Sequence, residues 1–379
     1  MDHESIIAKQ VRDSAPAMTI GKLAEKLGLS KSTVSRALSD YPDIAPATKK
    51  RVLAAAEKYR YRPSSYAQSI KTGVAKSVAL ILSVSNDMVQ QASLADLLDG
   101  LSSRLGQEEW TLTVATAADD QSDTDLQKRL IEEKKVDGFI IPRLKVNDPR
   151  VAMMQRLHVP YVIYGRGEYG RGEQNSGEAF YDLRTEDSMA DAVIRFAELG
   201  HRRIGYIGTG SNYVMSDIRE TGYKTGLSAA SLPCDETLIC RDAMTQDEGW
   251  RAALRLFANP KPPTAIVCAM DAAALGVYKA AAQLQLQIGE DVSVIGYDGI
   301  PEARYVSPNL TTYSNNSTIA GRILAELLLK KIRGEDSEQL GILADPVLVN
   351  RESDGPPRWT SEQLAARLAA RQIETPLEV

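Results

Sequence analysis

Polar side chains suited to contact with a nucleic acid gather on one short stretch near the amino terminus. Lys31, Ser32, Ser35 and Arg36 fall within six residues. Lys and Arg can donate hydrogen bonds to guanine edges in a major groove, and Ser or Thr hydroxyls can hold phosphates. These residue types therefore predict contact with double-stranded DNA. The alternative is an ordinary helical hairpin whose polar face is solvated.

Two short helices are expected to position these side chains. Leu23 and Leu27 share one face of a first helix, and Gly28 is suited to end it. Ser30 can cap a second helix, which turns its apolar residues inward and its polar residues outward. Two helices joined by a tight turn are typical of a helix-turn-helix.

Residues around this pair complete a small domain. A third helix is expected at 47–59, and residues 18–62 together form the DNA-binding head, preceded by a flexible extension at 1–17. The segment 63–76 is different, because a helix of about two turns with little to pack on is marginal in water. We expect it to become ordered only on a partner, as a hinge; the alternative is a plain tether.

The chain from position 77 alternates apolar strands with amphipathic helices. Strands are expected at 78–82, 110–115, 138–141, 161–164, 204–207, 265–268 and 292–297. Such alternation predicts α/β structure, with parallel sheets covered by helices on both faces. There are too many strands for one sheet. The sequence therefore predicts two doubly wound lobes with a ligand cleft at the carboxyl ends of their strands.

Charge divides the chain into a basic head and an acidic body. Residues 18–76 hold twelve Lys and Arg against four Asp and Glu, whereas residues 77–379 carry a net charge of −12. This asymmetry predicts that only the head meets a polyanion. The amino terminus lacks the pattern of a signal peptide, and no stretch approaches the ~18 apolar residues of a membrane span. We therefore expect a cytoplasmic protein with no membrane partner.

Catalytic and metal-binding patterns are not visible in the sequence. Cys234, Cys240 and Cys268 lack metal-ligand spacing and are expected to be reduced thiols. The glycine pairs at 165–167 and 208–210 are too short for nucleotide-binding loops. We expect neither enzymatic activity nor a cofactor.

Several of these stretches match the motifs of a known family. In the head they are Leu23-Ala24, Leu27-Gly28-Leu29-Ser30, Thr33-Val34-Ser35-Arg36-Ala37-Leu38 and Tyr61-Arg62-Pro63; in the core they are LGHRRIGYI at 199–207, VSVIGYD at 292–298 and NLTT at 309–312. Residues 18–71 resemble the DNA-binding head of the lactose-repressor (LacI/GalR) family. Residues 77–355 resemble its periplasmic-binding-protein-like core.

This resemblance implies roles for the head and the hinge. It places Lys31, Ser32 and Arg36 at base-reading positions, with Thr19, Ser30, Thr33 and Ser35 on phosphates, although Thr19 and Ser30 could serve only as helix caps. In the hinge it makes Ile70 the apolar wedge in the minor groove, with Ala67 facing the partner hinge and Lys71 on a phosphate. Ile is stiffer than the Leu usual at that position.

The resemblance also implies a small-molecule site between the lobes. Arg219 and Asp298 match family positions that suit a sugar or similar polyol, although each could instead belong to a structural ion pair. The other residues expected to face the ligand are Tyr164, Arg166, Met244, Met270 and Asn315. Arg143, Arg166 and Arg219 together would favour an anionic ligand as an alternative.

The family fold implies three crossings between the lobes, near 180–184, 313–316 and 340. The first lobe would then comprise residues 77–180 and 316–339, the second lobe 181–314 and 341–355, and the C-terminal tail 356–379. A short helix at 359–371 aligns Leu364 and Leu368, which could form a tetramer seam. This seam is shorter than a coiled coil requires, which favours a dimer.

Together these features predict a transcriptional repressor whose operator affinity is controlled by a small ligand, expected to be a sugar. We expect a homodimer on a pseudo-palindromic operator, because one head covers only a half-site. The first lobe, including helix 94–105, is expected to form the dimer contact, and the ligand to lower operator affinity; a corepressor is the alternative. A transporter's solute-binding protein would explain the core but not the basic head, and no motif supports an enzyme.

Overall fold

The computed structural model describes residues 18–62, 72–83, 93–167, 178–210, 212–335 and 340–372. The chain divides into two compact units, Met1–Ala75 and Lys76–Val379, which we call the head and the core. The hinge residues expected to contact DNA, Ala67, Ile70 and Lys71, lie outside the described residues.

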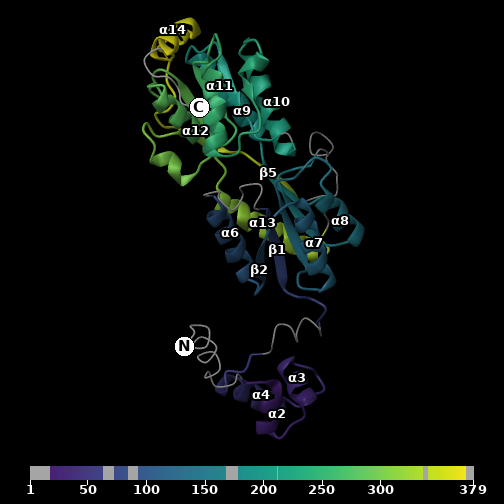
Figure 1. The fold of residues 1–379 in the computed structure, drawn as a ribbon. Coiled ribbons are helices and arrows are strands. Elements are labelled where there is room, and N and C mark those ends of the chain that lie inside the picture. The colour runs from purple at the N-terminus through teal and green to yellow at the C-terminus, as the bar shows by residue number, and fades with distance from the viewer. Residues whose placement is uncertain are drawn as a thin grey trace, which may run out of the picture. The chain divides into compact units, whose positions relative to one another are not determined.

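The head contains α2 (Ile20–Leu27), α3 (Lys31–Leu38) and α4 (Pro46–Lys58) (Figure 1). Thr19 and Ser30 cap the first two helices, each accepting a hydrogen bond from the backbone amide three residues later. Gly28 ends α2 with a φ of 63°, a left-handed conformation that glycine adopts without a steric penalty. The tight turn between α2 and α3 is the predicted helix-turn-helix.

A single apolar cluster holds the head together. Leu23, Val34 and Val52 come from the three helices in turn, and all are fully buried. Leu27 and Leu38 pack against them at the margin. Burying a side chain of this size contributes about 1.5–3 kcal/mol, so this cluster is what fixes the positions of α2 and α3.

The first lobe of the core is a parallel six-stranded sheet of order β11-β5-β4-β3-β1-β2. Its strands are β1 (Ser77–Ser83), β2 (Thr111–Ala117), β3 (Gly138–Pro142), β4 (Tyr161–Tyr164), β5 (Phe180–Leu183) and β11 (Gly341–Ala344). One face is covered by α6 (Leu94–Gly106) and α13 (Ser317–Ile332), and the other by α7 (Asp120–Glu132) and α8 (Pro149–Leu157) (Figure 1). Apolar residues alternate between these two helical layers along β1.

The second lobe is a six-stranded sheet of order β12-β10-β9-β8-β6-β7, in which only β12 is antiparallel. Its strands are β6 (Ile204–Ile207), β7 (Ile239–Cys240), β8 (Ala265–Cys268), β9 (Ser293–Asp298), β10 (Thr311–Ser314) and β12 (Val347–Val349). Helices α9 (Thr185–Glu198) and α10 (Val214–Ala229) cover one face, and α11 (Gln246–Phe257) and α12 (Asp271–Gln283) the other. Short 3₁₀ turns lie at Glu236–Leu238 and Pro301–Arg304.

The first crossing between the lobes lies at the end of its expected window at 180–184, whereas the last crossing falls later than the expected position near 340. β5 pairs with β4, and β11 pairs with β5, so both strands belong to the first sheet. The chain therefore leaves the first lobe after Leu183 and again after Ala344, which corrects the expected limits at 180 and 340. The first lobe comprises 77–183 and 317–344, and the second 185–314 and 347–372. These limits depend on pairing between strands that are distant in the sequence. The residues of β5 or β11 taken alone do not indicate which sheet the strand joins.

Residues 356–372 of the expected C-terminal tail pack on the second lobe. Helix α14 (Ser361–Gln372) buries Leu364 and Leu368, which are 0% and 4% exposed, in the cluster formed by α11 and α12. Trp359 donates a hydrogen bond to the Asp291 carboxylate at 2.6 Å just before this helix. Both leucines are therefore buried within their own chain and are not available to form the seam of a tetramer.

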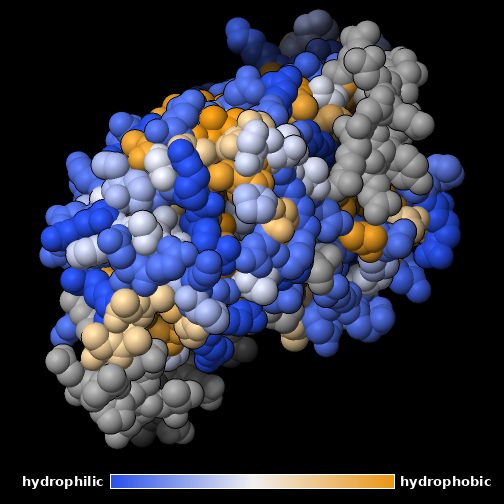
Figure 2. All heavy atoms as spheres, turned by 90° about the horizontal axis from the view of Figure 1, so that it is seen from above, coloured by the Kyte–Doolittle hydropathy of each residue, from blue (hydrophilic) through white to orange (hydrophobic). Residues whose placement is uncertain are grey.

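The molecular surface offers few other clues to a site. Figure 2 shows one face, where hydrophobic atoms lie among more numerous hydrophilic ones. Within the described ranges, no helix is long and apolar enough to cross a membrane, and no three His, Cys, Asp or Glu side chains come together in a way that could hold a metal ion.

Candidate functional site

The residues expected to contact DNA lie on and beside α3. Lys31, Ser32 and Arg36 are exposed, whereas Thr33 and Ser35 are half-buried. The Ser30 hydroxyl lies 2.7 Å from that of Ser32 and 2.8 Å from that of Thr33. This exposed row of hydroxyl and cationic groups can donate to phosphates and base edges. Thr19 and Ser30 each cap a helix, and this structural role holds whether or not they also contact DNA.

Arg36 has two partners within the head. Its guanidinium forms an ion pair with Asp43, and its Cζ atom lies 5.2 Å from the centre of the Tyr41 ring. The side chain is nevertheless 48% exposed. Asp43 did not stand out in the sequence, because its position near Arg36 depends on the turn that follows α3.

A candidate ligand site is a cavity between the two lobes of the core. Six of the seven predicted ligand residues line it: Tyr164, Arg166, Arg219, Met270, Asp298 and Asn315. Met244 is not among the described lining residues; its backbone amide instead donates to Glu248 near the start of α11.

Asp298 stands at the carboxyl end of β9 in an unusual backbone conformation. Its φ of 124° is rare for a residue with a side chain and marks a candidate functional position. Asp271 at the start of α12 holds the turn that follows: its carboxylate accepts from the amides of Gly299 at 2.8 Å and Ile300 at 3.0 Å. Thr312 donates to the same carboxylate at 2.6 Å. Asp271 is thus a structural support for Asp298.

Arg219 projects from α10 into the same cavity wall. It is 7% exposed, donates to the Ala269 carbonyl at 2.6 Å, and lies over the Tyr297 ring at 4.3 Å. Its Nε atom is buried without a hydrogen-bond partner. A buried donor left unsatisfied is costly, so a ligand hydroxyl at this position would complete the site.

Arg166 is held by carboxylates on both lobes. Its Nε lies 3.3 Å from Asp182 at the end of β5, and its Nη2 pairs with Glu186 at the start of α9. Its charge is therefore balanced within the chain. Asp182 also lines the cavity but was not predicted. Its place at the carboxyl end of a short strand could have revealed it, had that strand been assigned to the first sheet.

Burial controls the charge of the two cavity carboxylates. Loss of hydration raises the pKa of Asp298 to about 7, although nearby Arg219 favours its ionised form. The same cause raises the pKa of Asp182 to about 6. Both groups therefore titrate near neutral pH and can accept hydrogen bonds from hydroxyl groups when ionised.

Part of the remaining wall of the cavity is apolar. It includes side chains from α6, from the loop after β3 and from the start of α10: Leu94, Leu97, Leu144, Val214, Met215 and Ile218. A ligand with both an apolar face and a rim of hydroxyl groups would match this division. None of these six residues was predicted, because they meet only when α6, the loop after β3 and α10 pack together.

Backbone pairing joins the two lobes beside the cavity. Lys145 of the first lobe forms an antiparallel bridge with Tyr213 of the second. The Val146 amide donates to the Asn212 carbonyl, and the Val214 amide donates to the Leu144 carbonyl, each at 3.1 Å. We call residues 144–146 and 212–214 the interlobe bridge.

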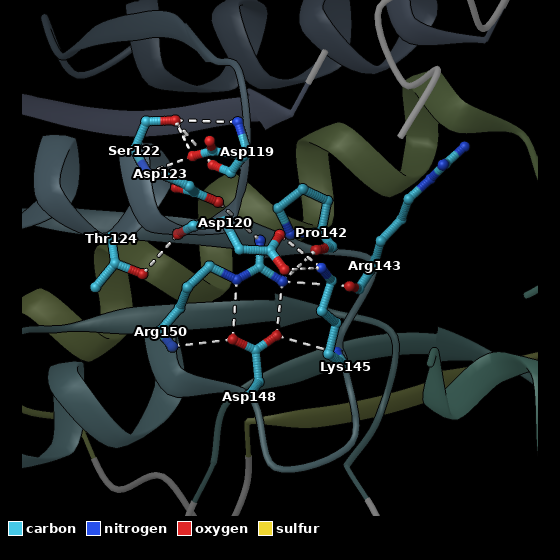
Figure 3. A network of polar contacts seen from close by, with 10 residues as sticks. All are labelled: Asp119, Asp120, Ser122, Asp123, Thr124, Pro142, Arg143, Lys145, Asp148 and Arg150. Atoms are coloured by element: carbon cyan, nitrogen blue, oxygen red, sulfur yellow. Dashed lines mark hydrogen bonds and ion pairs between the residues drawn. The ribbon is translucent and has the colours of Figure 1, made fainter. Parts of the chain in front are cut away.

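A polar network supports the first-lobe side of the interlobe bridge (Figure 3). Arg150 pairs with Asp148 and donates to the Arg143 carbonyl at 3.2 Å. Asp148 accepts from the Lys145 amide at 3.0 Å, and the Lys145 ammonium group pairs with Asp120. Figure 3 also shows the Arg143 side chain, which lines the cavity, extending away from this network.

Family models match both units of the chain. Residues 19–64 match the bacterial regulatory proteins of the lacI family, and residues 193–353 match a periplasmic binding protein-like domain. The transcriptional regulator AglR of Rhizobium meliloti strain 1021 is 31% identical over 349 residues, which cover 89% of this chain and 95% of AglR. The transcriptional repressor PurR of Escherichia coli strain ATCC 8739 is 29% identical over 342 residues, covering 89% and 98% of the two chains.

Solved structures show the same architecture. A complex of the transcriptional regulator CelR with cellobiose has a TM-score of 0.68 at 27% identity, covering 89% of this chain and 99% of CelR. A lac repressor dimer bound to operator and the anti-inducer ONPF has a TM-score of 0.76 at 21% identity, with coverage of 89% and 99%. The latter likeness concerns the fold alone.

Proposed function

Because the chain belongs to the lacI family of bacterial regulatory proteins, we propose that its head represses transcription at an operator under control of an effector in the core. One observation carries this proposal: Arg219 and Asp298, from different elements of the second lobe, line a cavity that the first lobe closes. An effector there can therefore couple the arrangement of the lobes to DNA binding.

The effector class follows from the chemistry of the cavity. Arg166 is already paired with two carboxylates, and Asp182 and Asp298 add negative charge to the lining. A phosphorylated or acidic ligand would face these carboxylates as well as Arg143 and Arg219, and the pairing of Arg166 weakens the case for the anionic alternative. We propose a neutral sugar of disaccharide size, with its hydroxyls on Arg219 and Asp298 and its apolar face on the leucine-rich wall. The cellobiose complex of the related regulator CelR supports this class.

On the DNA, we propose that Lys31, Ser32 and Arg36 read bases while the neighbouring hydroxyl groups hold phosphates. Ile70 would wedge a base step apart, Ala67 would face the second hinge, and Lys71 would contact a phosphate. Two heads are needed for a palindromic site, so we propose a homodimer formed through the first lobes. Because a bacterial operator lies in the cytoplasm, we propose a cytoplasmic location.

The direction of control is proposed to be induction. Twin hinges can meet on DNA only when the two first lobes hold one spacing, and closure of the cleft on a sugar would change that spacing. A coupling free energy of about 1–3 kcal/mol changes affinity several-fold to about a hundredfold.

Thermal shift measurements with a sugar panel test the effector class. We expect cellobiose or another neutral disaccharide to raise the melting temperature, because a ligand stabilises the state it binds, while sugar phosphates have no effect. Arg219→Ala should abolish that shift, whereas Arg241→Ala, at an exposed ion pair of the same lobe, should retain it. Stabilisation by sugar phosphates alone would contradict the proposed class.

A further inference from the structure

A short turn after α3 places two side chains against Arg36. The Tyr41 amide donates to the Arg36 carbonyl at 3.1 Å, and the Ile44 amide donates to the Tyr41 carbonyl at 3.2 Å. Residues 41–44 therefore form a hydrogen-bonded turn in which Pro42 occupies the second position, where its fixed φ favours this geometry. Ile44 anchors the turn by packing on the apolar cluster of the head. We call residues 41–44 the recognition turn.

The recognition turn constrains the Arg36 guanidinium from two sides. Asp43 pairs with Nη2, while the Tyr41 ring lies against the guanidinium carbon at 5.2 Å. Arginine has five donors in a planar fork. The ion pair leaves Nε, Nη1 and the second hydrogen of Nη2 to donate, and both contacts restrict the plane in which these donors can point. Orientation matters because reading of guanine requires two parallel donors aimed at O6 and N7.

We infer that Asp43 is a positioning residue for sequence readout: it orients Arg36 for one base pair and thereby sets operator specificity. This inference rests on the proposed function of the head. A carboxylate at this surface would otherwise only weaken DNA binding, because phosphates repel it. Ion pairs as exposed as this one contribute little to folding, so its effect belongs to recognition.

The chain supplies a matched control in the same loop. Asp40 is also an exposed carboxylate, but it pairs with Lys49 of α4, at 2.6 Å, and not with a recognition residue. It has a φ of 52°, a conformation that asparagine tolerates better than alanine does. Asp43→Ala and Asp40→Asn each remove one negative charge from the loop, so a purely electrostatic effect on DNA binding would be the same for both.

Selection of binding sites from a random duplex library by the full-length protein tests the inference. Wild type and Asp40→Asn should select the same half-site, whereas Asp43→Ala should lose roughly tenfold discrimination at one base pair per half-site. Arg36→Ala should lose preference at that same base pair, and a double variant should show no further loss. Circular dichroism melting should give equal stability for all five proteins.

Four outcomes distinguish the possible failures. An unchanged half-site for Asp43→Ala overturns the inference, as does a loss at a base pair that Arg36→Ala leaves intact. Equal tightening on every sequence by Asp43→Ala and Asp40→Asn also overturns it, since that result reports charge alone. If the wild-type protein selects no motif, the proposed function of the head is itself wrong, and the inference about Asp43 falls with it.

Discussion

Replacement of Asp298 by asparagine should stabilise the effector-free protein while removing its response to the effector. Burial raises the pKa of Asp298 from 3.8 in the unfolded chain to about 7 in the folded one. A raised carboxyl pKa means that folding opposes ionisation, so the stability of the wild type falls as pH rises from about 4 to 7 and is constant above. Asparagine keeps the shape of the side chain and does not ionise.

The shift in the pKa of Asp298 sets an upper limit on the stability that the asparagine variant can gain. A change of about three pK units corresponds to about 4 kcal/mol, which is an upper limit because the half-buried side chain retains contact with water. We therefore expect Asp298→Asn to raise the free energy of unfolding by about 1–2 kcal/mol at pH 8 and by less at pH 5.5. For a core of this size, each kcal/mol raises the melting temperature by about 2–4 °C.

Calorimetric melting of the effector-free protein at pH 5.5 and pH 8 provides the assay. Asp298→Asn should melt at a higher temperature than wild type, with the larger gain at pH 8, and should gain nothing from a disaccharide that stabilises wild type. Asp247→Asn, at an exposed carboxylate of the same lobe that pairs with Lys279, is the control. A lower melting temperature for Asp298→Asn at both pH values would refute the reasoning, as would a retained response to the disaccharide.

Other variants test the head, the interlobe bridge and the C-terminal helix. Arg36→Ala should cost about 1–3 kcal/mol of operator binding and relax one base pair per half-site in binding assays on variant operators; equal weakening on random DNA would contradict base reading. Lys145→Met removes the ion pair with Asp120 and should weaken effector binding several-fold in calorimetric titrations without changing operator affinity. Leu364→Ala should cost about 2–5 kcal/mol in chemical unfolding, as expected for a buried leucine, yet leave the sedimentation of the dimer unchanged.

Local signals in the sequence were sufficient for much of the fold. The caps Thr19 and Ser30 and the stop at Gly28 each act within one helical turn, so the helix-turn-helix could be predicted residue by residue. Apolar runs likewise located the central strands of both sheets, because parallel strands are buried on both faces.

Features that depend on distant contacts could not be predicted in this way. The lobe limits at 180 and 340 were misplaced because the pairing of β5 with β11 joins residues about 160 positions apart. Asp182 was not predicted because the strand that carries it, β5, was not placed in the first sheet. Asp43 was not predicted because it lies beside Arg36 only when the recognition turn folds back on α3. Met244 was expected at the cavity by analogy with an aromatic residue, but its segment is held at the start of α11 by Glu248.

Release of operator by the effector is the most direct test of the account. A fluorescently labelled operator, selected from genomic fragments by the wild-type protein, would be titrated with the neutral disaccharide that stabilises the protein, and its anisotropy followed. The account predicts that anisotropy falls for wild type and stays constant for Arg219→Ala, although both bind the operator equally well without sugar. Tighter binding on adding the sugar, or equal release from Arg219→Ala, would contradict it.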